Sequence, residues 1–217
     1  MAVTKAAGFG RSADDEAPLT VTTESVGDSS DPLLRPVTRT VLFADAVEYS
    51  RLVLEDEFGA LAFMRTCFGE FRRAAGQHNG TLVKTTGDGV VIEFEDAADA
   101  LRCAIASQQA LKALNMLRQQ RQQARFRIGI HRGDVMHEGG DIYGHSVNVA
   151  ARLQTFARPE GICISRAVRE AVGDRVDVAY RDLGADHFAR HDKLKTLGRL
   201  VRRLHDLGYE VELKQVA

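Results

Sequence analysis

Two aspartates in the sequence have the residue type and the setting to hold a divalent cation. Asp45 follows a run rich in β-branched and aromatic residues, VTRTVLF, and Asp88 lies in the segment TGDG between two short apolar runs. Paired carboxylates suit Mg²⁺, which keeps several waters and binds through one or two carboxylates together with substrate phosphates. An aspartate before glycine is most often only a turn residue, so Asp88 taken alone also fits a structural role.

The elements around these aspartates follow an α+β pattern. Apolar residues alternate in strands and recur at steps of three and four in helices. The sequence predicts strands over residues 37–45, 81–85, 90–94 and 126–135, and helices over about 56–78 and 96–123, with an Asp-Gly turn joining the second and third strands. This βαββαβ order is typical of ferredoxin-like domains, in which two helices cover one face of an antiparallel sheet and leave the other face for a ligand or partner. It predicts that Asp45 and Asp88 meet at one edge of the sheet.

Further elements are expected beyond Gly144. The segments HSVNVAARLQTFA and RAVREAV predict short helices, and GICIS and RVDVAYRDLG predict strands. The predicted fold class is therefore α+β, a ferredoxin-like βαββαβ core with additional helices and strands. Residues 1–36 are acidic and poor in large apolar groups, which predicts a flexible tail. Residues 37–184 form the predicted domain, and residues 185–217 an atypical C-terminal helix-strand tail.

The composition of the 217 residues argues against several classes of protein. The 29 basic and 30 acidic side chains give a net charge of −1, so nothing attracts the chain generally to nucleic acid or anionic lipid. No apolar run could span a membrane, and the start lacks the apolar core of a signal peptide. The cysteines, Cys67, Cys103 and Cys163, form no zinc-binding pattern. We therefore expect a cytoplasmic protein that binds neither nucleic acid nor membrane.

Four blocks of sequence closely resemble the catalytic domain of class III nucleotidyl cyclases, the adenylate and guanylate cyclase family. The blocks are LFADAVEYS, LVKTTGDGVVIEF, FRIGIHRGDV and GGDIYGHSVNVAARL, and the resemblance runs from about Val37 to Gly184. It implies a cyclase catalytic domain over residues 37–184. It also implies a homodimer in which each active site is built across the interface.

The resemblance also assigns roles to the residues that would bind substrate and metal. Asp45 and Asp88 match the metal ligands, which would hold two Mg²⁺ or Mn²⁺ ions per site. Lys84 matches the lysine that reads the purine, and Asp141 its acidic companion. Adenine has an acceptor at N1 and a donor amine at N6, which suit a lysine and an aspartate respectively. ATP is therefore the expected substrate.

The catalytic pair implied by the resemblance is Asn148 and Arg152. Residues four apart on a helix project side by side, so that one amide and one guanidinium can meet the same nucleotide. Arg152 would stabilise charge on the α-phosphate while the ribose 3′-hydroxyl attacks in line. The products would be 3′,5′-cyclic AMP and pyrophosphate, which makes the expected activity that of an adenylate cyclase.

Two departures from the family pattern leave an alternative open. Glu48 stands where the family usually has glycine, close to Asp45. After Gly184 the sequence departs altogether, and the family's phosphate-reaching lysine cannot be assigned to Lys193 or Lys195. The alternative hypothesis is a non-catalytic module that dimerises or binds nucleotide.

Overall fold

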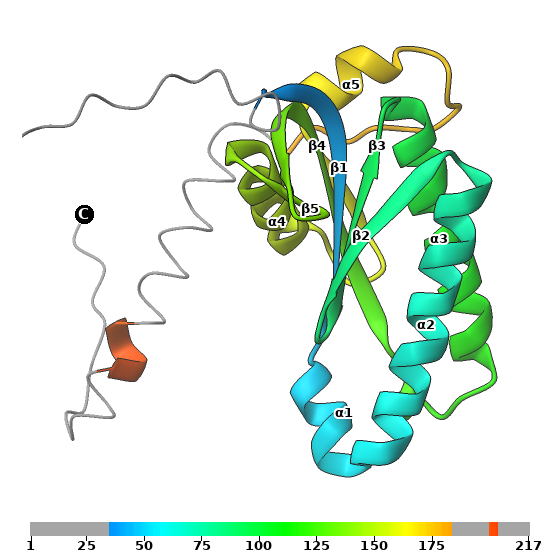
Figure 1. Ribbon diagram of the computed structural model, residues 1–217. Helices are drawn as coiled ribbons and strands as arrows, with labels where there is room; N and C mark the ends of the chain where they lie inside the picture. Colours follow the sequence, from blue (N-terminus) through cyan, green and yellow to red (C-terminus); the bar gives the residue numbers. More distant parts are fainter. Residues whose placement is uncertain (1–34, 184–199, 204–217) are drawn as a thin grey trace, which may run out of the picture. The chain divides into compact units, whose positions relative to one another are not determined.

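The computed structural model describes residues 35–183 and 200–203, and a six-stranded sheet carries helices on both faces (Figure 1). The strands are β1 (Val37–Val47), β2 (Gly80–Thr86), β3 (Gly89–Phe94), β4 (Arg125–Glu138), β5 (Asp141–Tyr143) and β6 (Ile162–Ile164). The helices are α1 (Tyr49–Glu55), α2 (Glu57–Gln77), α3 (Ala97–Met116), α4 (His145–Phe156) and α5 (Arg166–Val172), with a 3₁₀ turn η2 (Gln120–Gln122). None of the described helices is both long and apolar enough to cross a bilayer. Most of the predicted acidic tail and C-terminal tail lies outside the described residues.

The strand order matches the predicted ferredoxin-like core. Along the sheet the order is β2-β3-β1-β4-β5, and β1 pairs antiparallel with both β3 and β4. Strand β6 lies parallel to the first part of β4, and β5 pairs with its last residues. Because β3 returns from its turn directly beside β1, the end of β1 and the β2–β3 turn lie at the same end of the sheet.

One face of the sheet packs against α2 and α3 and forms the main core (Figure 1). Leu42 of β1 and Ile128 of β4 point to this face and are fully buried. Phe71 of α2 packs edge to face on Phe126 of β4, with 5.2 Å between the ring centroids. Side chains alternate between the two faces of a strand, so Asp45 lies on the second face.

Helix α4 and strand β5 cover part of this second face. Ala150 of α4 and Ile142 of β5 are buried there in a smaller apolar cluster with Val41 of β1. Gly129 of β4 allows the close contact, because a Cβ at this position would lie 2.3 Å from both the Ala150 carbonyl oxygen and the Gln154 nitrogen. The expectation that the second face is open is therefore wrong where α4 and β5 lie.

Several element boundaries differ from those predicted. The chain forms the separate short helix α1 between β1 and α2. Helix α3 ends at Met116 rather than near Gln123, because the buried Asn115 amide donates to the Ala124 carbonyl oxygen at 3.0 Å and accepts from the Ala124 amide at 3.1 Å. These two bonds turn the chain into β4. Residues 175–183, which belong to the predicted strand RVDVAYRDLG, have no regular secondary structure.

Candidate active site

Asp45 and Asp88 lie together at one end of the sheet. Asp45 pairs with Gly89 across β1 and β3, and the Ala46 amide donates to the Asp88 carbonyl oxygen at 2.9 Å. The turn between β2 and β3 consists of Gly87 and Asp88, and Gly87 has a φ of 63°, which favours glycine. The turn is thus Gly87-Asp88, one residue earlier than the predicted Asp-Gly pair. The strand order brings the two aspartates together as expected, and their role as metal ligands stays a prediction.

The two carboxylates repel each other. Burial, together with the charge of Asp88 and a hydrogen bond with it, raises the pKa of Asp45 to about 6, although the nearby Arg127 guanidinium opposes the change. A divalent cation would relieve this repulsion, and the carboxylate oxygens fit Mg²⁺ or Mn²⁺. Among the described residues no group of three or more His, Cys, Asp or Glu side chains could hold a metal ion. Water and substrate phosphates would have to supply the other ligands.

Arg127 is a functional candidate that the sequence reasoning missed. It lies opposite Asp45 in the register of β1 and β4, and its Nη2 is 3.8 Å from the Asp45 carboxylate. Its Nε–H is buried and has no hydrogen-bond partner among the described residues. A buried donor without an acceptor is costly, so an anion would be a favourable ligand here. The alternation in FRIGI, with Phe126 and Ile128 facing the core, is the signal that could have placed Arg127 on the face of Asp45.

Lys84 and Asp141, 57 residues apart in sequence, form an ion pair with Nζ 2.5 Å from Oδ2. An irregularity in the pairing of β2 between Leu82 and Lys84 puts the lysine opposite Val91, on the second face. The hydrogen bond from Lys84 holds the pKa of Asp141 below its ordinary value. The Tyr143 ring centroid lies 5.9 Å from the lysine Nζ. The cluster therefore presents a cationic donor and an anionic acceptor side by side.

Asn148 and Arg152 lie one turn apart on α4, and both side chains are exposed. They occupy the side of the helix opposite Ala150, which is fully buried against the sheet. Asp45 lies on the sheet face itself. The acid pair and the Asn148–Arg152 pair therefore face in different directions within one chain.

Glu48 follows β1 with left-handed backbone angles, φ 57° and ψ 35°, where glycine is the residue that fits without strain. Its Oε2 lies 3.5 Å from the Arg51 Nε and 3.8 Å from the Arg125 Nη2. The carboxylate is thus directed to two arginines. These ion pairs explain how a second acidic side chain, Glu48, is accommodated close to Asp45 in the sequence.

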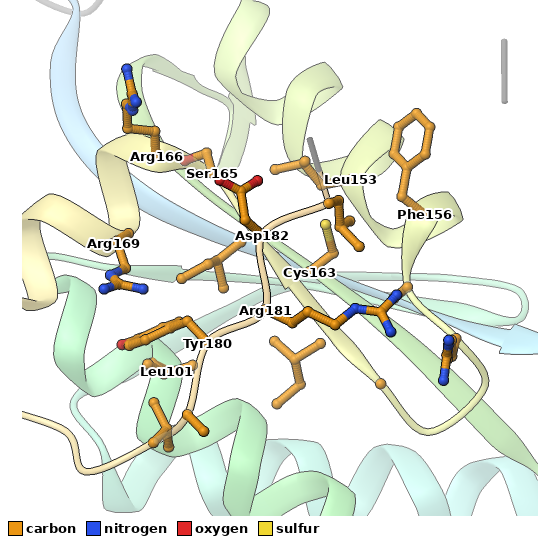
Figure 2. A pocket seen from close by; sticks show the side chains of 18 of the residues that line it. Leu101, Leu153, Phe156, Cys163, Ser165, Arg166, Arg169, Tyr180, Arg181 and Asp182 are labelled. Carbon is orange, nitrogen blue, oxygen red and sulfur yellow. The ribbon is translucent and has the colours of Figure 1, made fainter. Parts of the chain in front are cut away.

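A separate cavity of about 1190 Å³ lies beside β6 (Figure 2). Leu101 of α3, Leu153 of α4 and Cys163 of β6 line it, and the segment 178–183 forms another wall. There the Arg169 guanidinium lies over the Tyr180 ring, with its Cζ 4.0 Å from the ring centroid. None of the six predicted site residues lines this cavity, so it is distinct from the candidate site.

Comparison with known proteins identifies relatives for most of the described chain. The family model of the adenylate and guanylate cyclase catalytic domain matches residues 36–195. The putative adenylate cyclase 3 of Rhizobium meliloti (strain 1021) is 40% identical over 145 residues, which cover 66% of this chain and 25% of that protein. An adenylate cyclase of Streptomyces coelicolor is 32% identical over 132 residues, which cover 59% of this chain and 32% of that protein. The chain thus spans only a quarter to a third of the length of these relatives.

A solved structure agrees with the fold. The adenylate/guanylate cyclase/hydrolase from Silicibacter pomeroyi matches with a TM-score of 0.64 and 39% sequence identity. The match covers 69% of this chain and 88% of that chain. The similarity therefore extends over nearly the whole of that solved protein.

Proposed function

The chain belongs to the family of adenylate and guanylate cyclase catalytic domains, and from this premise we propose that it converts ATP into 3′,5′-cyclic AMP and pyrophosphate. The observation that carries the choice of ATP is the Lys84–Asp141 pair, with Nζ 2.5 Å from Oδ2. Adenine accepts a hydrogen bond at N1 and donates one from N6, so it fits an ammonium beside a carboxylate. Guanine would place its O6 acceptor opposite the carboxylate. The names of the relatives, as adenylate cyclases, support the same choice.

In this proposal Asp45 and Asp88 hold two Mg²⁺ or Mn²⁺ ions. Such ions offset the charge of the triphosphate and make the ribose 3′-hydroxyl a better nucleophile. Arg127, next to Asp45 and with an unsatisfied buried Nε–H, supplies a further positive charge on the same side. The acid end of the sheet would therefore bind the phosphates, while Lys84 and Asp141 would bind the base.

Asn148 and Arg152 act on the ribose and the α-phosphate. The Asn148 amide orients the ribose so that its 3′-oxygen faces the α-phosphorus in line with the leaving pyrophosphate. The Arg152 guanidinium donates to the α-phosphate oxygens as negative charge develops on them. This pair needs no proton transfer, because it works by alignment and by charge.

We propose that these two residues come from the second subunit of a homodimer. The support is the direction of the side chains, because Asn148 and Arg152 face away from the sheet on which Asp45 lies. A symmetric pair of chains would complete two identical sites.

A product assay tests the proposed function. Purified chain is incubated with ATP or with GTP in the presence of Mn²⁺, and cyclic nucleotides are separated by chromatography. We expect cyclic AMP from ATP, and we expect Arg152→Ala to lower kcat by about 100-fold or more without changing the fold. Cyclic GMP as the main product would contradict the assignment of Lys84 and Asp141. A folded dimer that makes no cyclic nucleotide would favour the non-catalytic module instead.

A further inference from the structure

The cavity beside β6 has walls that are mostly apolar (Figure 2). The walls come from three elements and one irregular segment, and they include Leu101 of α3, Leu153 of α4, Ile162 of β6 and Val178. The cavity volume of about 1190 Å³ slightly exceeds the range of roughly 300–1,000 Å³ that is usual for small-molecule sites. A ligand with a long apolar body therefore fits the space.

The charged side chains around this cavity are almost all basic. Among the described residues that line it, the charged ones are Arg158, Arg166, Arg169, Arg181 and Asp182. All five are exposed, whereas the apolar lining is buried or half-buried, so the charges lie at the rim. The whole chain has a net charge of −1, so the excess of arginine is a local property of this rim.

Three of these arginines have no acidic partner within the part of the chain that the structure describes. The side chains of Arg158 and Arg181 form no ion pair or hydrogen bond there. Arg169 lies over the Tyr180 ring, with its Cζ 4.0 Å from the ring centroid, and has no carboxylate beside it among the described residues. Cations at the edge of an apolar space favour an anionic group at the same edge.

Arg166 differs from the other arginines of the rim. Its Nε lies 3.8 Å from the Glu170 Oε1, and its side chain is 90% exposed. Figure 2 shows this side chain directed away from Cys163 and Tyr180. Arg166 is therefore a matched control for the arginines that have no acidic partner.

The C-terminal residues of the chain are a poor electrostatic match for the rim. Residues 184–217, of which only 200–203 are described, carry seven Lys and Arg side chains and five Asp and Glu. Their net charge is positive, like that of the rim. A separate anion therefore complements the arginines better than this segment does.

We propose that the cavity binds a long-chain monocarboxylic acid, with the alkyl chain against the apolar walls and the carboxylate at the rim beside Arg181. Burying a charge among apolar side chains is costly, so the carboxylate stays at the rim. There a planar guanidinium donates two parallel hydrogen bonds to it. Burial of the alkyl chain supplies most of the affinity, because contacts between exposed charges are weak. This site is separate from the proposed catalytic site and does not depend on the proposed function.

Titration of the full chain with laurate, below its micelle concentration, tests the proposal by isothermal titration calorimetry. We expect saturable binding of one laurate per chain. Octanoate, shorter by four CH₂ groups, should bind at least about tenfold more weakly, because each buried CH₂ strengthens binding up to about fourfold. Dodecyltrimethylammonium has a chain of the same length with a cationic head, and it should not bind.

Two arginine variants locate the carboxylate. We expect Arg181→Gln to weaken laurate binding by about two- to fivefold, because an exposed charge pair is lost. Arg166→Gln removes the same charge from a side chain that points away, so it should leave the affinity unchanged at physiological salt. Circular dichroism of each variant confirms that the fold is retained.

Several outcomes would overturn the proposal. Equal affinities for laurate and octanoate would show that no chain is buried, and equal affinities for laurate and dodecyltrimethylammonium would show that the arginines select no anion. Equal effects of Arg181→Gln and Arg166→Gln would remove the carboxylate from the rim. Binding of laurate only after proteolysis has trimmed the C-terminus would assign the cavity to residues 184–217 instead.

Discussion

The acid pair makes the stability of the metal-free chain depend on pH. The pKa of Asp45 rises from 3.8 to about 6 in the folded chain, through burial and the Asp88 charge. A raised carboxyl pKa means that the folded state holds the proton more tightly than the unfolded state. The stabilising contribution of the protonated Asp45 carboxyl is complete below the pKa of the unfolded state, and it is lost as the pH rises through about 6. Above that pH, the ionised Asp45 opposes folding.

The variant Asp45→Asn tests this dependence, because asparagine keeps the shape and removes the charge. In the presence of EDTA we expect the variant to be more stable than the wild type at about pH 7, with the difference shrinking toward about pH 4. Urea unfolding followed by circular dichroism at each pH gives the two free energies. A stability difference that does not change with pH would show that Asp45 titrates as an ordinary surface carboxyl.

The backbone of Glu48 carries strain that glycine would remove. Its φ of 57° is costly for a residue with a Cβ, so we expect Glu48→Gly to raise the free energy of unfolding by about 1 kcal/mol. Glu48→Ala is the matched control, since it also removes the carboxylate but keeps the strain. Thermal or urea unfolding compares the two. Equal stabilities of the glycine and alanine variants would contradict strain at this position.

Single residues were predictable where strand order determines their position. The sequence predicts that Asp45 and Asp88 approach, because one ends a strand and the other turns the hairpin beside it. Arg127 was missed because its contact with Asp45 depends on the register between β1 and β4, which is a long-range property. The ion pairs of Glu48 could not be predicted either, since they depend on a left-handed backbone and on Arg125, far away in sequence.

Among the elements, α4 depends on Gly129 for its position. A methyl group there would lie 2.3 Å from the backbone of α4, at Ala150 and Gln154, and backbone cannot move aside cheaply. We expect Gly129→Ala to cost about 2–3 kcal/mol of stability. It should also lower kcat by at least about tenfold, because Asn148 and Arg152 move with the helix. Urea unfolding and the cyclic AMP assay measure both effects.

Gly69 provides the control for this substitution. It lies on an exposed part of α2, and a Cβ there would meet no atom within 4 Å. Gly69→Ala should therefore stabilise the chain by about 0.5–1 kcal/mol through helix propensity and leave kcat unchanged. A Gly129→Ala variant that behaves like Gly69→Ala would contradict the close packing of α4 on β4.

Helices and strands could be predicted where apolar residues recur at a regular spacing. The periods of α2, α3 and the hairpin strands are clear in the sequence, and these elements appear close to their predicted positions. The end of α3 was predicted too late, because Asn115 ends the helix through hydrogen bonds to Ala124 that no period reveals. The segment 175–183 alternates like a strand yet forms no strand, and its residues 178–183 line the cavity beside β6. Strand formation needs a partner edge as well as a pattern.

At the scale of the whole molecule, the fold class followed from the order of the elements. A βαββαβ chain with two amphipathic helices has few ways to bury them, and the observed order β2-β3-β1-β4 is one of these. The contacts between subunits do not follow from the order of the elements, because they depend on surfaces that a single sequence does not identify. The direction of Asn148 and Arg152 on α4 supports the proposal that a second copy completes the site.

Complementation between two inactive variants tests this shared site most directly. Asp45→Ala removes an acid and Asn148→Ala removes the amide from α4, so a mixed dimer keeps one intact site and one doubly damaged site. The two variant chains are dissociated, mixed in equal amounts and reassociated. The mixture should then show about a quarter of the wild-type cyclic AMP production, since half of the dimers are mixed and each mixed dimer has one working site. A mixture of Asp45→Ala with Asp88→Ala should restore none, because both lesions fall on the same half of the site. Activity of the first mixture no higher than that of either variant alone would contradict the account.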